Sequence, residues 1–145
     1  MKTSKNTSFG PQFGNRLILA DDEPLLLRAF SAYLTKAGYL IAGQFGDGDE
    51  VVEFFDQNGR AADILVLDYR MPRMDGLQTA KLLKQKIPDL KIVLCSAYSL
   101  AKDSQMDLFD AIIQKPCSGK ELLDSIAGLL PSNEGVSSDK KAGAF

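Results

Sequence analysis

The sequence predicts a doubly wound α/β fold, a five-stranded parallel sheet with helices on both faces, in three layers. Short apolar runs alternate along the chain with longer amphipathic stretches. Alternation of this length is typical of a parallel sheet whose crossover helices cover both faces. The run at residues 64–67 (ILVL) is apolar throughout, which indicates a strand that is covered on both sides.

The apolar runs and the helical repeats predict where each element lies. Strands are expected at residues 17–20, 39–45, 64–67, 90–95 and 110–114. Apolar residues at helical spacing predict helices over residues 26–37, 49–57, 77–86 and 121–130. Gly38, Asn58-Gly59 and Pro88 are stop signals for the first three helices. Residues 98–108 have the weakest pattern and predict one short helix, which completes a (βα)5 order.

Length and composition favour one globular domain. The chain has 145 residues, of which 45% are hydrophobic and 25% charged, as is usual for soluble domains. The folded part is expected at residues 16–130. The segments 1–15 and 131–145 are rich in small and polar residues and cannot offset the entropy cost of ordering. Both are predicted to be flexible, the second as a tail or a linker stub.

Charge and residue counts exclude several classes of function. The chain has 17 Lys and Arg against 19 Asp and Glu, a net charge of −2, and no histidine. Without histidine there is no Ser-His-Asp or Cys-His catalytic site and no His-ligated zinc. The slight negative charge predicts no direct binding to nucleic acid, because that binding depends on neutralising phosphates.

Cysteine count and hydropathy predict a cytoplasmic protein that does not insert into membranes. Cys95 and Cys117 are too few for a disulfide framework and indicate reduced thiols. Cys95 lies in an apolar run and is expected in the core, and for Cys117 a packing role is favoured over a redox role. No apolar run approaches the ~18 residues that span a bilayer, and residues 1–15 contain no apolar signal core.

Functional side chains are expected where the strands end, because ligands of such sheets bind at the carboxyl ends of the strands. The residues that follow the first, third, fourth and fifth strands are Asp21-Asp22-Glu23, Asp68, Ser96 and Lys115-Pro116. Clustered carboxylates suit a hard cation such as Mg²⁺, or Mn²⁺ in its place. A hydroxyl and an ammonium group aimed at the same point can hold the oxygens of a phosphoryl group.

The segment from Asp68 to Gly76 (DYRMPRMDG) resembles the signature of the response-regulator receiver domain, an Asp followed by x-x-Met-Pro-x-Met-Asp-Gly. The acidic pair, Ser96 and Lys115-Pro116 match the other marks of that family, in the family's order, over residues 16–130. The resemblance implies the flavodoxin-like form of the doubly wound fold. It also implies a signalling domain of two-component systems rather than a conventional turnover enzyme.

The resemblance implies a phosphoryl acceptor and a metal site. Asp68 is the expected phosphoacceptor. Asp22 is expected to bind Mg²⁺ directly and Asp21 to support it. Asp68 and the backbone carbonyl of Arg70 are the further metal ligands.

The resemblance also implies how phosphorylation is sensed. Ser96 is expected to bind a phosphoryl oxygen and to move, Lys115 to pair with the phosphoryl group, and Pro116 to shape the next loop, usually through a cis peptide bond. The donor is expected to be a phosphohistidine on a sensor histidine kinase or a histidine phosphotransfer protein, since this chain has no histidine. The output is a shift of the face formed by the fourth strand, the next helix and the fifth strand, toward a downstream effector protein or domain.

Several residues distinguish this chain from the common pattern of the family. Ile112 stands where the family usually has a Tyr or Phe that changes rotamer on phosphorylation. Ser96 and Lys115 are 19 positions apart, closer than is common, so the helix between them is expected to be short, irregular or displaced. Arg70 and Tyr98 are large side chains at positions that border the phosphoryl group, and we hypothesise that they slow its loss by excluding water.

Alternative interpretations remain open on the sequence alone. The pair Asp21-Asp22 can be explained as a cap of the first helix, and Asp75 is expected to be a plain N-cap. The second functional hypothesis is a receiver-like interaction module that is independent of phosphorylation, which Ile112 favours. A haloacid-dehalogenase-type phosphatase would need a second Asp where Arg70 stands. A flavin-binding relative would need a phosphate-binding loop where the acidic pair stands.

Overall fold

Five parallel strands form one sheet in the computed structural model, which describes residues 15–97 and 106–130. The strands are β1 (Arg16–Ala20), β2 (Leu40–Phe45), β3 (Ile64–Asp68), β4 (Lys91–Ser96) and β5 (Ala111–Gln114). Their order across the sheet is β2-β1-β3-β4-β5, so the direction of winding reverses between β1 and β3. The segments predicted to be flexible, apart from Asn15, and Tyr98 lie outside the described residues.

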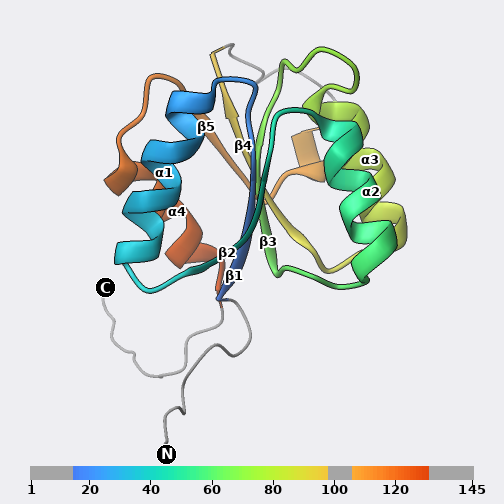
Figure 1. Cartoon of the computed structure of the whole chain (residues 1–145), viewed down its shortest axis with the longest axis horizontal. Coiled ribbons are helices and arrows are strands. Elements are labelled where there is room, and N and C mark those ends of the chain that lie inside the picture. The colour runs from blue at the N-terminus through green and yellow to red at the C-terminus, as the bar shows by residue number, and fades with distance from the viewer. Residues whose placement is uncertain (1–14, 98–105, 131–145) are drawn as a thin grey trace, which may run out of the picture.

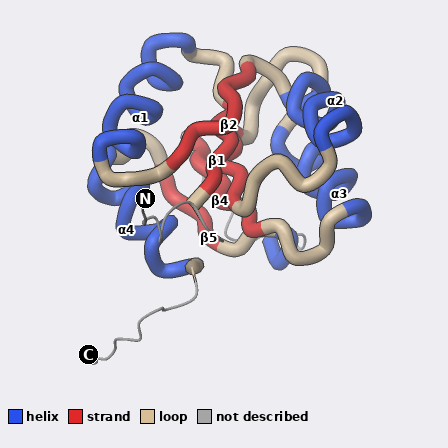
Figure 2. The backbone as a smooth tube through the Cα atoms, turned by 60° about the horizontal axis from the view of Figure 1, so that its bottom comes forward, coloured by secondary structure: helices blue, strands red, loops and turns tan. Residues whose placement is uncertain are grey.

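Helices cover both faces of the sheet and give three layers. They are α1 (Pro24–Lys36), α2 (Gly48–Asn58), α3 (Gly76–Lys86) and α4 (Gly119–Leu129). The helices α1 and α4 lie together on one face and α2 and α3 on the other (Figure 1). Figure 2 shows the strands running between these two pairs of helices. The doubly wound α/β fold predicted from the sequence is confirmed.

The sheet is the centre of two apolar cores, one beneath each pair of helices. All five residues of β3 are buried, which confirms the continuous apolar run as a strand covered on both faces. Leu65 and Leu67 face the core beneath α2 and α3, and Ile64 and Val66 face the core beneath α1 and α4. Each such side chain contributes about 1.5–3 kcal/mol when it is fully buried, so the middle of the sheet fixes the strand ends firmly.

Local capping signals explain where the helices begin. Asp75 is the N-cap of α3 and forms a capping box with Gln78, as predicted for Asp75. The helix α4 begins at Gly119, two residues before the predicted start, because Ser118 and Glu121 form a second capping box. These boxes satisfy backbone N–H groups that have no partner inside the helix.

The region predicted to hold one short helix, residues 98–108, is described only in part. Its described end is a 3₁₀ helix, η1 (Met106–Leu108), and residues 98–105 lie outside the described part. Within residues 15–97 and 106–130, no helix is long and apolar enough to cross a membrane.

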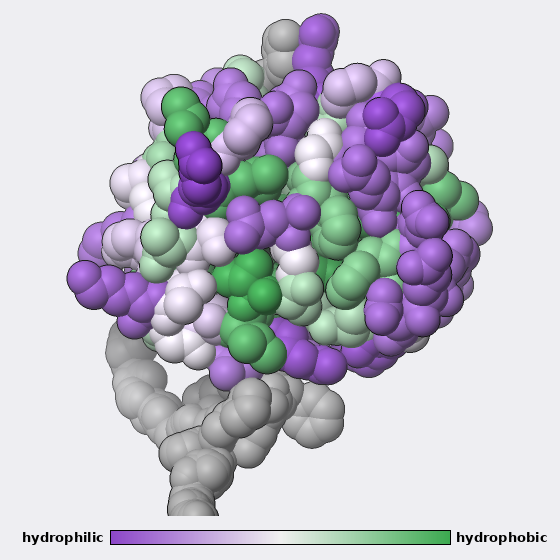
Figure 3. Space-filling view, in the orientation of Figure 1, coloured by the Kyte–Doolittle hydropathy of each residue, from purple (hydrophilic) through white to green (hydrophobic). Residues whose placement is uncertain are grey.

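The edge strands carry exposed apolar side chains. Leu40 on β2 and Ile112 on β5 are 52% and 41% exposed. Figure 3 shows apolar side chains gathered in the middle of one face, between the two pairs of helices, and hydrophilic side chains over the side of α2 and α3. Ile112 lies at the outer edge of the sheet, at the position expected from the sequence.

Candidate functional site

Three carboxylates meet where the winding of the sheet reverses. Asp21 follows β1 directly, Asp22 comes next, and Asp68 is the last residue of β3, which pairs with β1. One carboxylate oxygen from each residue lies within 4.8 Å of the other two. Asp21 and Asp68 are each only 7% exposed, whereas Asp22 is exposed. The structure therefore brings together the three acidic residues that the sequence predicted as neighbours.

Lys115 extends into this cluster from the end of β5. Its Nζ lies 2.7 Å from Asp21 Oδ2 and 3.4 Å from Asp68 Oδ1. Burial alone lowers the pKa of Lys115, but the hydrogen bond and the negative charges of Asp21 and Asp68 outweigh burial and raise that pKa. The ammonium group thus stays charged beside two buried carboxylates. The peptide bond between Lys115 and Pro116 is cis, as the family resemblance implied.

Asp68 has a pKa of about 6, well above its usual value of 3.8. Burial is the main cause, and the charges of Asp21 and Asp22 add to it, while Lys115 opposes the rise. The negative charges of the three crowded carboxylates are therefore only partly neutralised by the one ammonium group. Oxygen ligands at this spacing fit a hard divalent cation such as Mg²⁺, which would relieve the repulsion.

Ser96 is the last residue of β4 and is fully buried. Its position in the sheet is one residue beyond Cys95, the strand partner of Asp68. The backbone N–H of Lys115 donates to the Ser96 carbonyl oxygen at 2.7 Å. The ends of β4 and β5 are thereby fixed to each other, and they carry the predicted hydroxyl and ammonium groups on adjacent strands.

An open cavity of about 500 Å³ gives access to the exposed side of the cluster. It is lined by Asp22, Tyr69, Arg70, Met71, Pro72 and Asp75. Asp22 therefore connects the buried carboxylates to solvent. Arg70 lines this opening, and Tyr98, its companion in the sequence hypothesis, lies outside the described residues.

The alternative interpretation of Asp21 and Asp22 as helix caps agrees with the structure only for Asp21, which accepts one backbone N–H group at the start of α1. The N-cap of α1 is Glu23, and its side chain makes no capping hydrogen bond. The backbone N–H of Glu23 donates to Asp21 Oδ1 at 3.0 Å, while Asp21 Oδ2 accepts from Lys115. Asp21 thus orders the start of α1 and holds Lys115 at the same time.

Asp47 is a residue that sequence reasoning missed. It follows β2, is 2% exposed, and accepts backbone N–H groups from Arg73 and Met74, each at 2.8 Å. These bonds hold the loop after Asp68 against the start of α2. In the sequence Asp47 stands in a Gly-Asp-Gly turn, where an acidic residue has no distinguishing signal.

Gly76, the first residue of α3, packs against the backbone at the start of the same loop. A Cβ atom at Gly76 would lie 2.5 Å from the Asp68 carbonyl oxygen and 3.0 Å from Tyr69 Cα. The Gly76 N–H also donates to the Tyr69 carbonyl oxygen at 2.7 Å. Only glycine permits the first turn of α3 to approach the end of β3 this closely.

Replacing Lys115 by methionine should raise the pKa of the Asp68 carboxyl group further. The substitution keeps most of the length of the side chain but removes the positive charge that favours the ionised form of Asp68. The measurement is an NMR titration of the side-chain carboxyl carbons without divalent metal. The matched control is Lys120→Met, because Lys120 pairs with Asp124 on the exposed surface of α4. An unchanged Asp68 titration in Lys115→Met would contradict the contact between Lys115 and Asp68.

Comparisons with known proteins identify the family. The family model of the response regulator receiver domain matches residues 17–127 of the chain. The chain is 34% identical over 84 residues to the chemotaxis protein CheY of Thermotoga maritima, covering 58% of this chain and 68% of CheY. It is 30% identical over 132 residues to the transcriptional regulatory protein PdtaR of Mycobacterium tuberculosis, covering 86% of this chain and 60% of PdtaR.

Solved structures agree with this assignment. The response regulator TrrA of Thermotoga maritima, in complex with Mg²⁺-BeF, superposes with a TM-score of 0.73 at 30% identity, covering 80% of this chain and 99% of TrrA. The CheX-CheY-BeF3-Mg complex of Borrelia burgdorferi gives a TM-score of 0.76 at 22% identity, covering 86% of this chain and 93% of the matched chain, and supports the fold alone. Receiver domains are signalling domains and generally not conventional enzymes. This chain belongs to the response regulator receiver domain family of two-component systems.

Proposed function

We propose that this chain receives a phosphoryl group on Asp68 from a phosphohistidine of a sensor histidine kinase or a histidine phosphotransfer protein. The observation that carries the proposal is the buried Asp68 carboxylate with the Lys115 ammonium group 3.4 Å away, beside an opening to solvent. These 145 residues contain no histidine, so the donor group lies outside them.

The residues of the site have separate tasks in the transfer. A carboxylate oxygen of Asp68 attacks phosphorus, a P–O bond forms, and the P–N bond to the donor histidine breaks with its electron pair on the nitrogen. Lys115 is close enough to neutralise a phosphoryl oxygen at the moment of transfer. Ser96, at the end of the neighbouring strand, offers a hydroxyl group to a second oxygen.

The acidic cluster is the proposed metal site. Asp21, Asp22, Asp68 and the backbone carbonyl of Arg70 would hold Mg²⁺, or Mn²⁺ in its place. When bound, the ion would supply positive charge to the phosphoryl oxygens as a Lewis acid. Support comes from the spacing of the carboxylates and from the Mg²⁺-BeF complex of the related TrrA.

The proposed output is a shift of the face that β4, the following segment and β5 form, read by a downstream effector protein or domain. Ser96 begins this shift when its hydroxyl turns to the phosphoryl group. Ile112, exposed on β5, has no ring to move, so the change is proposed to reach an effector through the backbone of β4 and β5 rather than through an aromatic rotamer. Arg70, along the opening, is proposed to shield the phosphoryl group from water.

Incubation of the full chain with acetyl phosphate should test the proposal directly. We expect the intact mass to rise by one phosphoryl group when Mg²⁺ is present, and peptide mapping should locate the group on Asp68. Removal of Mg²⁺ with a chelator should abolish the labelling, and addition of excess Mg²⁺ should restore it. Labelling that survives chelation, or that maps to another carboxylate, would contradict the proposal. Failure to bind either beryllofluoride or phosphate would favour the phosphorylation-independent interaction module.

A further inference from the structure

The two cysteines of the chain meet in the fold. Cys95 lies near the end of β4, and Cys117 lies in the link between β5 and α4. Their Sγ atoms are 4.0 Å apart, and both side chains belong to the core beneath α1 and α4. We infer that Cys95 and Cys117 form a modification site, a dithiol that small oxidants convert into a reversible intramolecular disulfide. This inference does not depend on the proposed phosphoryl transfer.

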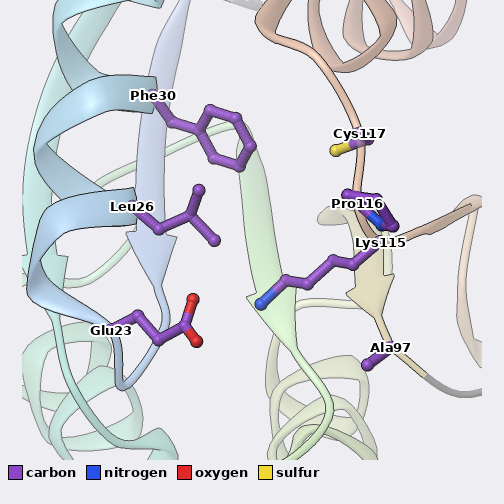
Figure 4. Close-up of a pocket in the computed structure, with 7 residues that line it drawn as sticks. All are labelled: Glu23, Leu26, Phe30, Ala97, Lys115, Pro116 and Cys117. Atoms are coloured by element: carbon purple, nitrogen blue, oxygen red, sulfur yellow. The ribbon is translucent and has the colours of Figure 1, made fainter.

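Only one of the two thiols, that of Cys117, can be reached from solvent. Cys117 lines a cavity of about 360 Å³ together with Leu26, Phe30 and Lys115, and Figure 4 shows its sulfur pointing toward the Phe30 side of that cavity. Cys95 is only 2% exposed. A small reagent therefore reaches Cys117 first, and Cys95 reacts second, with the neighbouring Cys117 adduct.

The chemistry balances with a two-electron oxidant such as a diazenedicarboxamide. The Cys117 sulfur adds to one nitrogen of the N=N bond, and its proton goes to the other nitrogen. The Cys95 sulfur then attacks the Cys117 sulfur, an S–S bond forms, and the hydrazine leaves with the second proton. Burial raises the pKa of both thiols, so neither is readily ionised. The two sulfurs are expected to react with each other because they are close, not because they are thiolates.

The geometry indicates which part of the chain must move. The sulfurs must approach by about 2 Å, because a disulfide bond is about 2.05 Å long. Cys95 is held on both sides by β3 and β5, whereas Cys117 lies outside the sheet. The link after β5 therefore closes the distance, and it begins with Lys115, two residues before Cys117. Oxidation is thus expected to displace the ammonium group at the carboxylate cluster.

The test is oxidation of the full chain at low protein concentration by diamide, the bis(dimethylamide) of diazenedicarboxylic acid and thus an oxidant of the diazenedicarboxamide class. We expect a monomer that has lost two hydrogen atoms, in which alkylating reagents modify neither cysteine until a reductant is added. Peptide mapping should find Cys95 joined to Cys117. Cys117→Ser should keep one protected thiol, and Cys95→Ala should give only mixed adducts or linked dimers. Two thiols that stay free in the oxidised wild type, or a wild type that yields only dimers, would overturn the inference.

A trivalent arsenical provides a second measurement that needs no oxidation. Phenylarsine oxide binds tightly to two thiols at once and only weakly to one. We expect one arsenical for each native chain, and protection of Cys117 from alkylation. An arsenical that binds no better to wild type than to Cys117→Ser would overturn the inference. Because both readouts are masses, they remain valid if Asp68 proves not to accept a phosphoryl group.

Discussion

Replacement of Asp68 by asparagine should abolish labelling by acetyl phosphate and, without divalent metal, should stabilise the fold. The labelling is lost because the amide has no carboxylate oxygen to attack phosphorus. The fold gains because burial disfavours the charged carboxylate and its acidic neighbours repel it, as its pKa of about 6 indicates. Removal of this buried charge is expected to raise the free energy of unfolding by about 2–3 kcal/mol at pH 7.

The gain has a defined pH dependence. A carboxyl group with a raised pKa binds its proton more tightly in the folded state than in the unfolded state. The stabilisation from that proton is complete below the unfolded pKa of 3.8 and is lost as the pH rises through about 6. Asp68→Asn mimics the protonated form at every pH, so the two proteins should be equally stable near pH 3.5 and should differ most above pH 6.

Thermal or urea unfolding in a chelator, repeated across this pH range, measures the difference. The matched control is Asp56→Asn, since Asp56 pairs with Lys86 on the surface, far from the cluster. The control should keep full labelling and change stability by less than about 1 kcal/mol. Labelling retained in Asp68→Asn, or a stability difference that does not grow with pH, would contradict the assignment.

Replacement of Asp47 by alanine should lower the free energy of unfolding by about 3 kcal/mol, since two part-buried backbone N–H groups lose a charged acceptor. The loop after Asp68 should also loosen, and labelling by acetyl phosphate should slow. Chemical denaturation measures the first effect and the rate of mass increase the second.

Asp49→Ala is the matched control for this second prediction. Asp49 lies two residues after Asp47 and binds the same residue, Arg73, but through an exposed side-chain ion pair at 2.7 Å. Exposed pairs of this kind contribute little to stability, because water screens them. Equal losses in Asp47→Ala and Asp49→Ala would show that the anchoring bonds to the loop backbone are not what stabilises this region.

Much of the fold could be predicted because its determinants are local. The all-apolar run of β3, the stop at Gly38 and the N-cap at Asp75 each act within a few residues, and the structure has each of them. The strand ends also followed from topology, since parallel strands place their carboxyl ends at one edge. That is why Asp21, Asp22, Asp68 and Lys115, far apart in sequence, could be predicted to meet.

The remaining features depend on contacts that no local pattern records. Asp47 has its effect through loop N–H groups 26 and 27 positions away, and its sequence context is that of an ordinary turn. The Cys95 and Cys117 sulfurs meet across 22 positions, and the sequence favoured simple packing for Cys117. The start of α4 was predicted two residues late because its capping box, Ser118 and Glu121, precedes the apolar repeat.

The charge balance of the site depends on the strand at the margin of the sheet. Lys115 follows β5, which has four residues and pairs with β4 alone in the sheet order, and its ion pair with Asp21 spans 94 positions. During synthesis, the carboxylates on β1 and β3 emerge long before their counter-charge. Afterwards, each local detachment of β5 withdraws that charge again. Amide hydrogen exchange along β5 therefore reports how often the acidic cluster is left without Lys115.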